Sequence, residues 1–311
     1  MTLTTYTRWR TDTQSNSNSM KFVFITDLHI TGVCNVRYGD PTEDIRQKLA
    51  FVVDYCNEND AQLLIGGDLF DKSIVSDSVK SAIAPEFIRL KHRAISINGN
   101  HDRMYDNDDF EYKTSYNVFT SHGVITDITN AEIQFGNVVV TNKLPIADRG
   151  LNQIVIFHGF LNLEDGRNTF HTSDLTVKTD KVRVFLGHDH TVHEPIVVGN
   201  AEIHRIGSFF RMDRTEESNR IPQMAVIDGD TMEVTYLPIT ASRSADDVFK
   251  VRLDTAKEET KCVLTYESLM RHLSGNTQEE STLIEALRQV TDDDTIRYIE
   301  MLMAEHNQTI K

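Results

Sequence analysis

Short apolar runs recur along the chain, and each has the length of a buried strand. The runs are rich in β-branched and other apolar residues, a composition that favours strands covered on both faces. They cover residues 21–25, 62–65, 94–97, 153–156 and 182–186. Further strands are expected over residues 137–142 and in a hairpin over residues 223–237 that turns at Asp228-Gly229-Asp230.

Apolar residues at helical spacing lie between some of these runs. Residues 44–58 place Leu49, Val52, Val53 and Cys56 on one face, which predicts an amphipathic helix. Residues 76–90 have a similar pattern, and we expect Pro85 to interrupt it. Near the C-terminus, two strands are expected, followed by two helix-like stretches. These four segments are residues 248–254, 260–266, 282–290 and 294–303.

Each of the five apolar runs is followed by polar residues of types that bind metals. The segments are Asp27-Leu28-His29, Gly67-Asp68-Leu69-Phe70-Asp71, Gly99-Asn100-His101-Asp102, Phe157-His158-Gly159 and Gly187-His188-Asp189-His190. Together they offer carboxylate, imidazole and amide groups, which suit borderline divalent metals. Ligands of layered α/β proteins lie outside the carboxyl ends of the strands, so the five segments should converge. One segment alone occurs by chance in many chains, whereas the ordered set predicts a metal centre.

In order and residue type, the five segments resemble those of the calcineurin-like metallophosphoesterase superfamily, over roughly residues 20–240. The resemblance implies an α/β fold, a four-layer β-sandwich flanked by helices, with two metals at one edge. It also assigns a role to each polar residue. One metal would be held by Asp27, His29 and His190, the other by Asn100, His158 and His188, and Asp68 would bridge them. His101 would contact the phosphate and assist departure of the leaving group, and Asp102 would orient His101.

Two metals in such a centre have a clear chemical purpose. Cations about 3.5–4 Å apart can clamp the attacking and leaving oxygens of an in-line phosphoryl displacement. A carboxylate between the cations offsets their mutual repulsion. The resemblance makes Mn²⁺ the leading candidate, while the mixed oxygen and nitrogen ligands leave Fe, Zn and Mg open.

Two segments suggest a narrower resemblance. Gly67-Asp68-Leu69-Phe70-Asp71 and Gly207-Ser208-Phe209-Phe210-Arg211 are similar to segments of the nuclease subunit of the bacterial SbcCD complex and its phage relatives. That implies a DNA exo- or endonuclease, with an SbcC-like ABC-type ATPase docked on the C-terminal helices and homodimerisation left open. Archaeal and eukaryotic members have a histidine where this chain has Asp71. The alternatives are a stand-alone phosphatase or phosphodiesterase acting on a nucleotide or phosphoprotein, and a non-catalytic scaffold.

The rest of the sequence indicates a cytoplasmic enzyme of three parts. We expect a disordered extension at residues 1–19, a catalytic domain at residues 20–240 and a small capping or partner-binding module at residues 241–311. The net charge of −15 argues against broad nonspecific affinity for nucleic acid, although a local basic patch could still receive a DNA backbone. No apolar stretch has the length of a membrane span, and no secretory signal is visible.

Two histidines outside the five segments are candidates for lining a substrate groove. His193 follows the last segment, and His204 lies in a strand-like run before Gly207. Surface or hydrogen-bonded roles are the more frequent fate of such histidines, so both assignments stay open. The three cysteines, Cys34, Cys56 and Cys262, have no paired spacing, which fits packing residues in a reducing compartment.

Overall fold

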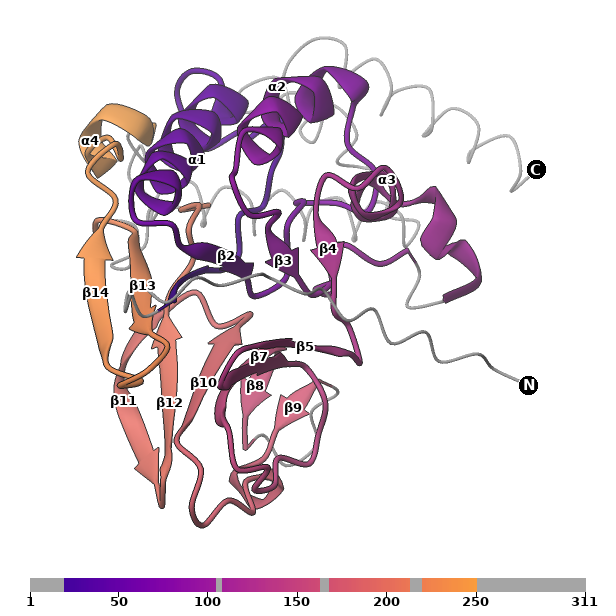
Figure 1. The fold of residues 1–311 in the computed structure, drawn as a ribbon. Helices are drawn as coiled ribbons and strands as arrows, with labels where there is room; N and C mark the ends of the chain where they lie inside the picture. The colour runs from indigo at the N-terminus through magenta and orange to yellow at the C-terminus, as the bar shows by residue number, and fades with distance from the viewer. Residues whose placement is uncertain (1–19, 105–107, 163–167, 213–219, 251–311) are drawn as a thin grey trace, which may run out of the picture. The chain divides into compact units, whose positions relative to one another are not determined.

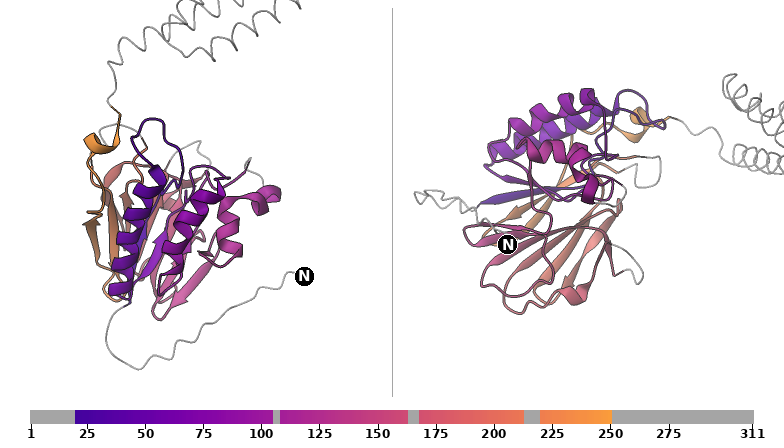
Figure 2. Two further views of the ribbon diagram at one scale, coloured as in Figure 1. Left: turned by 90° about the horizontal axis from the view of Figure 1, so that it is seen from above. Right: turned by 90° about the vertical axis from the view of Figure 1, so that its right-hand side faces the viewer.

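Two six-stranded sheets face each other in this computed structural model, and helices cover the outer face of one of them (Figure 1). The structure describes residues 20–104, 108–162, 168–212 and 220–250. The helices lie on one side of the two sheets in a second orientation as well (Figure 2). The expected mixed α/β sandwich is thereby confirmed.

The first sheet combines a parallel centre with an antiparallel hairpin at one edge. Its order is β14-β13-β1-β2-β3-β4, and β1 to β4 run parallel. The strands are β1 (Lys21–Ile25), β2 (Gln62–Ile65), β3 (Ile95–Ser96), β4 (Thr126–Asp127), β13 (Gln223–Asp228) and β14 (Val234–Pro238). The hairpin of β13 and β14 pairs antiparallel, as the sequence predicted.

Helices α1 (Pro41–Glu58) and α2 (Asp77–Ile88) cover the outer face of this sheet, together with α3 (Ser115–Ser121). Helix α1 begins where the Asp40 side chain accepts a hydrogen bond from the N–H of Thr42. Its apolar face packs on the outward residues of β1 and β2. Pro85 lies inside α2 without interrupting it, contrary to expectation. Only one turn follows Pro85 before the helix ends, so the lost hydrogen bond costs the helix little of its length.

The second sheet has the order β11-β12-β10-β7-β6-β5. Its strands are β5 (Glu132–Phe135), β6 (Val138–Thr141), β7 (Asn152–His158), β10 (Val182–Gly187), β11 (Val192–Val198) and β12 (Ala201–Ile206). Alternate side chains of β7 and β10 point to the two faces, and both faces are buried. Ile154, Ile156 and Phe185 pack against the first sheet, where Phe185 meets Phe24 at a ring-centroid distance of 4.7 Å.

The outer face of the second sheet is covered differently from the four-layer expectation. Among the described residues it packs on the short strands β8 (Phe160–Leu161) and β9 (Thr169–Phe170) and on neighbouring loops. The 3₁₀ helix η2 (Thr172–Asp174) follows β9, and a second one, η1 (Asp108–Lys113), precedes α3. The central β7 and β10 are apolar on both faces, so this side of the sheet requires a cover even without long helices.

The described chain ends with α4 (Ala245–Val248) and Lys250. The carbonyl oxygen of Val248 accepts a hydrogen bond from the N–H of Tyr38 at 2.7 Å, and Phe249 forms a bridge with Arg37. Residues 241–250, expected in the C-terminal module, therefore contact the segment that precedes α1, and the boundary at residue 240 stays a prediction. The expected strand at 260–266, the helices at 282–290 and 294–303 and the extension at 1–19 lie outside the described residues, as does the expected strand at 248–254 beyond Lys250.

Candidate metal centre

The five polar segments meet because parallel strands of both sheets end at the same edge. Backbone hydrogen bonds join the loop after β1 to the loop after β2: the N–H of Asp27 donates to the oxygen of Gly67, and that of His29 donates to the oxygen of Asp68. The N–H of His188, after β10, donates to the Asp27 carboxylate at 3.0 Å. The convergence predicted from the strand ends is therefore present.

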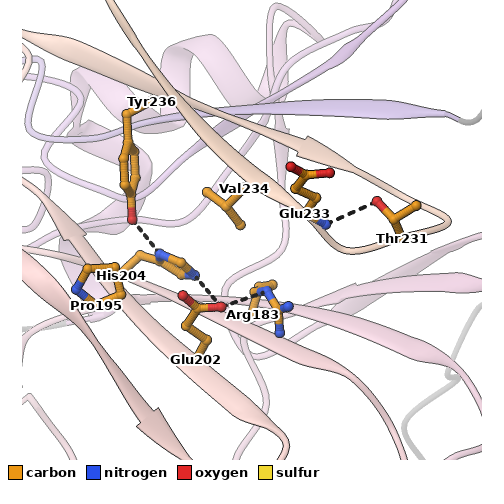
Figure 3. Close-up of a pocket in the computed structure, with 8 residues that line it drawn as sticks. All are labelled: Arg183, Pro195, Glu202, His204, Thr231, Glu233, Val234 and Tyr236. Atoms are coloured by element: carbon orange, nitrogen blue, oxygen red, sulfur yellow. Dashed lines mark hydrogen bonds and ion pairs between the residues drawn. The ribbon is translucent and has the colours of Figure 1, made fainter.

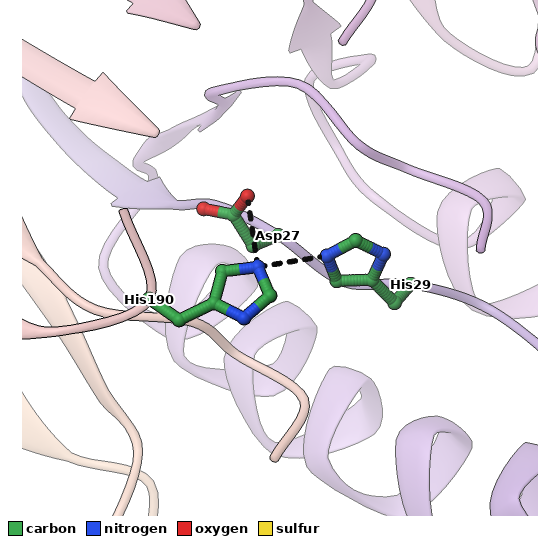
Figure 4. A group of neighbouring side chains, drawn as sticks. All are labelled: Asp27, His29 and His190. Carbon is green, nitrogen blue, oxygen red and sulfur yellow. Dashed lines mark hydrogen bonds and ion pairs between the residues drawn. The ribbon is translucent and has the colours of Figure 1, made fainter. Parts of the chain in front are cut away.

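One group of ligand atoms consists of Asp27, His29 and His190 (Figure 4). The Nε2 atoms of the two histidines are 3.0 Å apart, and His190 Nε2 is 3.7 Å from Asp27 Oδ1. Asp27 and His29 are fully buried, so water does not reach their polar atoms. Three such atoms within 4.8 Å of one another can share one cation.

A second group consists of Asp68, His158 and His188, with Asn100 between the two imidazoles. The amide oxygen of Asn100 is 3.1 Å from His158 Nε2 and 2.9 Å from His188 Nδ1. Asp68 Oδ2 is 3.2 Å from His158 Nε2 and 3.8 Å from His29 Nε2. One carboxylate oxygen thus faces both groups, the position that a bridging ligand requires.

At neutral pH, His29 and Asp68 have the protonation states of metal ligands, whereas His158 carries a proton that a metal would have to displace. Burial lowers the pKa of His29 to about 3, so the imidazole is neutral and has a free lone pair at neutral pH. Burial alone would raise the pKa of Asp68, but the hydrogen bond and charge of His158 bring it to about 2. Burial alone would lower the pKa of His158, but the hydrogen bond to Asp68 and the charge of Asp27 raise it to about 9. A cation would have to displace that proton.

Several of these residues have a left-handed backbone, which non-glycine residues rarely adopt. The φ angles are 54° at Asp27, 42° at His29, 46° at Asp68 and 84° at His188. Asp, Asn and His tolerate this region better than other residues, and such conformations persist where the surrounding structure enforces them. Gly99 is equally constrained, because a Cβ there would lie 2.0 Å from Asp68 Oδ1. The loops therefore hold the ligands in place before any metal binds.

His101 lies beside both groups, and its ring is oriented by Asp71. The backbone N–H of His101 donates to Asp68 Oδ1 at 2.9 Å, and the ring atom Nδ1 of His101 is 2.6 Å from the backbone oxygen of Asp71. A carbonyl oxygen can only accept, so Nδ1 carries a proton and Nε2 is the nitrogen left for a substrate. The Asp71 carboxylate is 3.8 Å from His29 Nδ1, and His29, Asp71 and His101 also form a third group of potential ligands.

The role expected of Asp102 needs correction, because its carboxylate binds backbone groups. Asp102 Oδ2 accepts hydrogen bonds from the N–H groups of Leu69 and Gly99, and Oδ1 accepts one from Phe70. Asp102 therefore ties the loop after β2 to the loop after β3, and His101 is oriented by Asp71. Burial raises the pKa of Asp102 to about 7. The sequence alone contained one signal for Asp71, its position in the same segment as Asp68.

His193 and His204 have other partners. His193 Nε2 is 2.8 Å from the Asp189 carboxylate at the surface, so Asp189 binds a histidine that is not part of the three groups. His204 is buried, stacks on Phe185, and pairs through Nδ1 with the Tyr236 hydroxyl at 2.6 Å. It lines a cavity of about 460 Å³ between β12 and the hairpin of β13 and β14 (Figure 3).

No helix among the described residues has the length and apolar character needed to cross a membrane. A comparison with curated protein sequences gave no match. Two similar solved structures are the 5'-nucleotidase from Candida albicans and the 5'-nucleotidase precursor from Thermus thermophilus. The first has a TM-score of 0.41 at 13% identity and covers 73% of this chain and 53% of its own. The second has a TM-score of 0.41 at 14% identity, and the match covers 83% of this chain and 60% of that protein.

This chain thus spans between half and two thirds of the length of those two proteins. A comparison with protein families matched one part of this chain, and that part contains every candidate ligand of the two groups described above. The match is to the family described as calcineurin-like phosphoesterase and covers residues 20–213. Because that match covers more than half of the chain, the chain belongs to the calcineurin-like phosphoesterase family.

Proposed function

We propose that this metal-dependent phosphoesterase cleaves phosphodiester bonds in DNA, as the nuclease subunit of an SbcD-type complex with an SbcC-like ATPase. The observation that carries the hydrolytic part is the pair of ligand groups that share Asp68. Two cations held there, with Mn²⁺ the leading candidate, would supply charge neutralisation and polarisation of the phosphoryl group. Their ligands would be Asp27, His29 and His190 in one group, and Asn100, His158 and His188 in the other.

The residues of the chain have distinct tasks in this reaction. Asp68 holds His101 through the backbone N–H, and Asp71 fixes the tautomer of its ring. That leaves Nε2 of a half-buried imidazole for the reacting phosphate. As an imidazolium, with a second proton on Nε2, His101 would stabilise developing charge and deliver that proton to the leaving oxygen. Asp102 contributes by holding both loops in register.

The DNA part of the proposal has support from two segments that resemble SbcD-type nucleases. Gly67-Asp68-Leu69-Phe70-Asp71 supplies the bridging carboxylate and the residue that orients His101. The second segment, Gly207-Ser208-Phe209-Phe210-Arg211, packs directly on the loop after β1, which carries Asp27 and His29. The N–H of Phe209 donates to the oxygen of Thr26 at 2.9 Å, and that of Phe210 donates to the oxygen of Asp27 at 3.2 Å. Both resembling segments therefore contribute to the same centre.

A second candidate is hydrolysis of a small nucleotide, and the charge of the chain favours it. A formal net charge of −15 repels a long polyanion more strongly than a mononucleotide. The metal centre serves either substrate, because both present a phosphoester to it.

The test compares substrates on one preparation with Mn²⁺. Single- and double-stranded DNA, bis-p-nitrophenyl phosphate and a nucleoside 5′-monophosphate are assayed in parallel, with Asp27→Asn as the control for contaminating nucleases. Cleavage of DNA that disappears in the control supports the nuclease. Turnover of the monophosphate without DNA cleavage would replace it with the nucleotidase, and activity on the p-nitrophenyl ester alone would contradict both.

A further inference from the structure

A partly exposed aromatic side chain lies next to the second ligand group. Phe160 is 40% exposed, and its ring centroid is 4.3 Å from that of His188 with the two planes at 88°. Other phenylalanines nearby, Phe157 and Phe170, pack into the hydrophobic cluster under β8 and β9, whereas Phe160 belongs to no hydrophobic cluster of the described residues. Its ring is thus in contact with His188 of the candidate metal centre and is also partly exposed to solvent.

The backbone around Phe160 is held firmly in place. The Phe160 N–H donates to the oxygen of Asn168 at 3.0 Å, and Phe160 pairs with Thr169 in the β8–β9 ladder. The preceding Gly159 donates to the oxygen of Gly187, the residue before His188. No other residue fits at Gly159, because a Cβ would lie 1.8 Å from the oxygen of Asn168. Phe160 and His188 are therefore fixed relative to each other.

From this arrangement we propose that Phe160 is a stacking platform for the nucleobase next to the phosphoester that is cleaved. The inference rests on the proposed function and deepens it, since it identifies a nucleoside unit as the part of the substrate that this enzyme recognises. A ring held at the edge of the site binds any base through its π face, without reading sequence. It also restricts how the phosphate can enter, because the base and the phosphate belong to one nucleotide.

Stacking suits a protein with this charge. The chain carries a net charge of −15, so the molecule as a whole repels a phosphate group. Attraction between Lys or Arg and phosphate also weakens steeply as the salt concentration is raised. Base–aromatic stacking contributes about 1–3 kcal/mol per base. That corresponds to a change in binding of about 5- to 150-fold, by the rule that 1.4 kcal/mol is tenfold. The exposed apolar surface of the Phe160 ring is unfavourable in water, and a stacked base would bury part of that surface.

The experiment uses the full chain and matched substrates with and without a base. If DNA is cleaved, the substrates are oligonucleotides with a tetrahydrofuran abasic unit on one or the other side of the scissile phosphate. If a mononucleotide is cleaved, they are dAMP and deoxyribose 5-phosphate. The variants are Phe160→Leu, which keeps an apolar side chain but loses the π face, and Phe160→Tyr, which keeps that face. Metal content is measured for each.

We expect Phe160→Leu to raise KM about 5- to 150-fold for the substrate with a base. The effect on kcat should be under threefold, the KM for the abasic substrate should stay within twofold of wild type, and Phe160→Tyr should restore the lower KM. Equal increases for both substrates, or no increase for either, would overturn the stacking role. Loss of metal in both variants would also overturn the stacking role, because it would show that Phe160 only supports the structure of the metal centre. If the wild type cleaves no nucleoside-containing substrate, the proposed function itself fails.

Discussion

Single side chains determine whether this centre can hold two cations, and Asp68 is the most informative of them. Its Oδ2 faces His29 at 3.8 Å and His158 at 3.2 Å. We predict that Asp68→Asn loses most metal from both groups, because it removes the negative charge between two cations. Elemental analysis after desalting measures the loss. Asp60→Asn is a matched control, since Asp60 is also an aspartate with a left-handed backbone, φ 51°. Full metal occupancy in Asp68→Asn would contradict the bridging role.

His101 separates metal binding from chemistry at the same scale. Its Nδ1 is held by the oxygen of Asp71, so the ring can act on a substrate without binding a metal. We predict that His101→Ala keeps both metals and lowers kcat by about 10²–10⁴-fold, as is typical for the loss of an acid–base group. Metal content and steady-state kinetics are measured on one sample, beside His122→Ala, a change at an exposed histidine. Loss of metal would instead make His101 a ligand, as in the third group of potential ligands.

At the scale of elements, Asp102 holds together the loops that follow β2 and β3. Asp102→Ala leaves the N–H groups of Leu69, Phe70 and Gly99 without their acceptor. Each buried unsatisfied donor costs about 1–3 kcal/mol, so we predict a loss of about 2–4 kcal/mol in the free energy of unfolding, after relief of the buried charge. Asp102→Asn, which keeps one acceptor oxygen, should lose less. Urea denaturation followed by circular dichroism gives both values, and equal stability of all three proteins would contradict this bracing role.

The contact of β12 with β14 makes the sandwich sensitive to acid through His204. Burial lowers the pKa of His204 to about 4, whereas the unfolded chain takes up that proton near pH 6.5. Protonation therefore favours the unfolded state, and about 3 kcal/mol of stability that is present above pH 6.5 is lost as the pH falls to 4. His204→Gln should remove this part of the pH dependence. Unfolding free energies at pH 7 and 4.5 test it, with His92→Gln as an exposed control; equal slopes in all three proteins would contradict it.

At the scale of the whole molecule, the metal centre and the C-terminal segment should be separable. All the candidate ligands lie between Asp27 and His190, in the described part of the chain that ends at Lys250. We predict that deletion of residues 275–311 leaves a folded enzyme that cleaves bis-p-nitrophenyl phosphate at the wild-type rate. The deletion should abolish binding of an SbcC-like ATPase and weaken processing of long DNA. An insoluble product, or parallel loss of activity on the small ester, would show that this segment completes the catalytic unit.

Much of the site could be predicted from local sequence because its ligands follow strands directly. The five strands expected before the polar segments are present, and the polar residues after them converge. Pro85 was misjudged, since a proline near the end of a helix removes few hydrogen bonds. Asp102 was misjudged because three backbone N–H groups, two of them more than thirty residues away along the chain, converge on its carboxylate. A buried carboxylate takes whichever donors the fold brings to it.

The sequence by itself determined the strands, the order of the ligand residues and their chemical types, because each depends on short-range pattern and on the side chains present. Only the tertiary structure decided which atoms meet. It placed one Asp68 oxygen between two groups of candidate ligands and paired His101 Nδ1 with the backbone oxygen of Asp71. It also left the ring of Phe160 partly exposed beside His188. These outcomes depend on loops from different strands packing together, with four candidate ligand residues held in left-handed conformations that the surrounding structure enforces. No local pattern specifies such contacts, since their partners lie far apart along the chain.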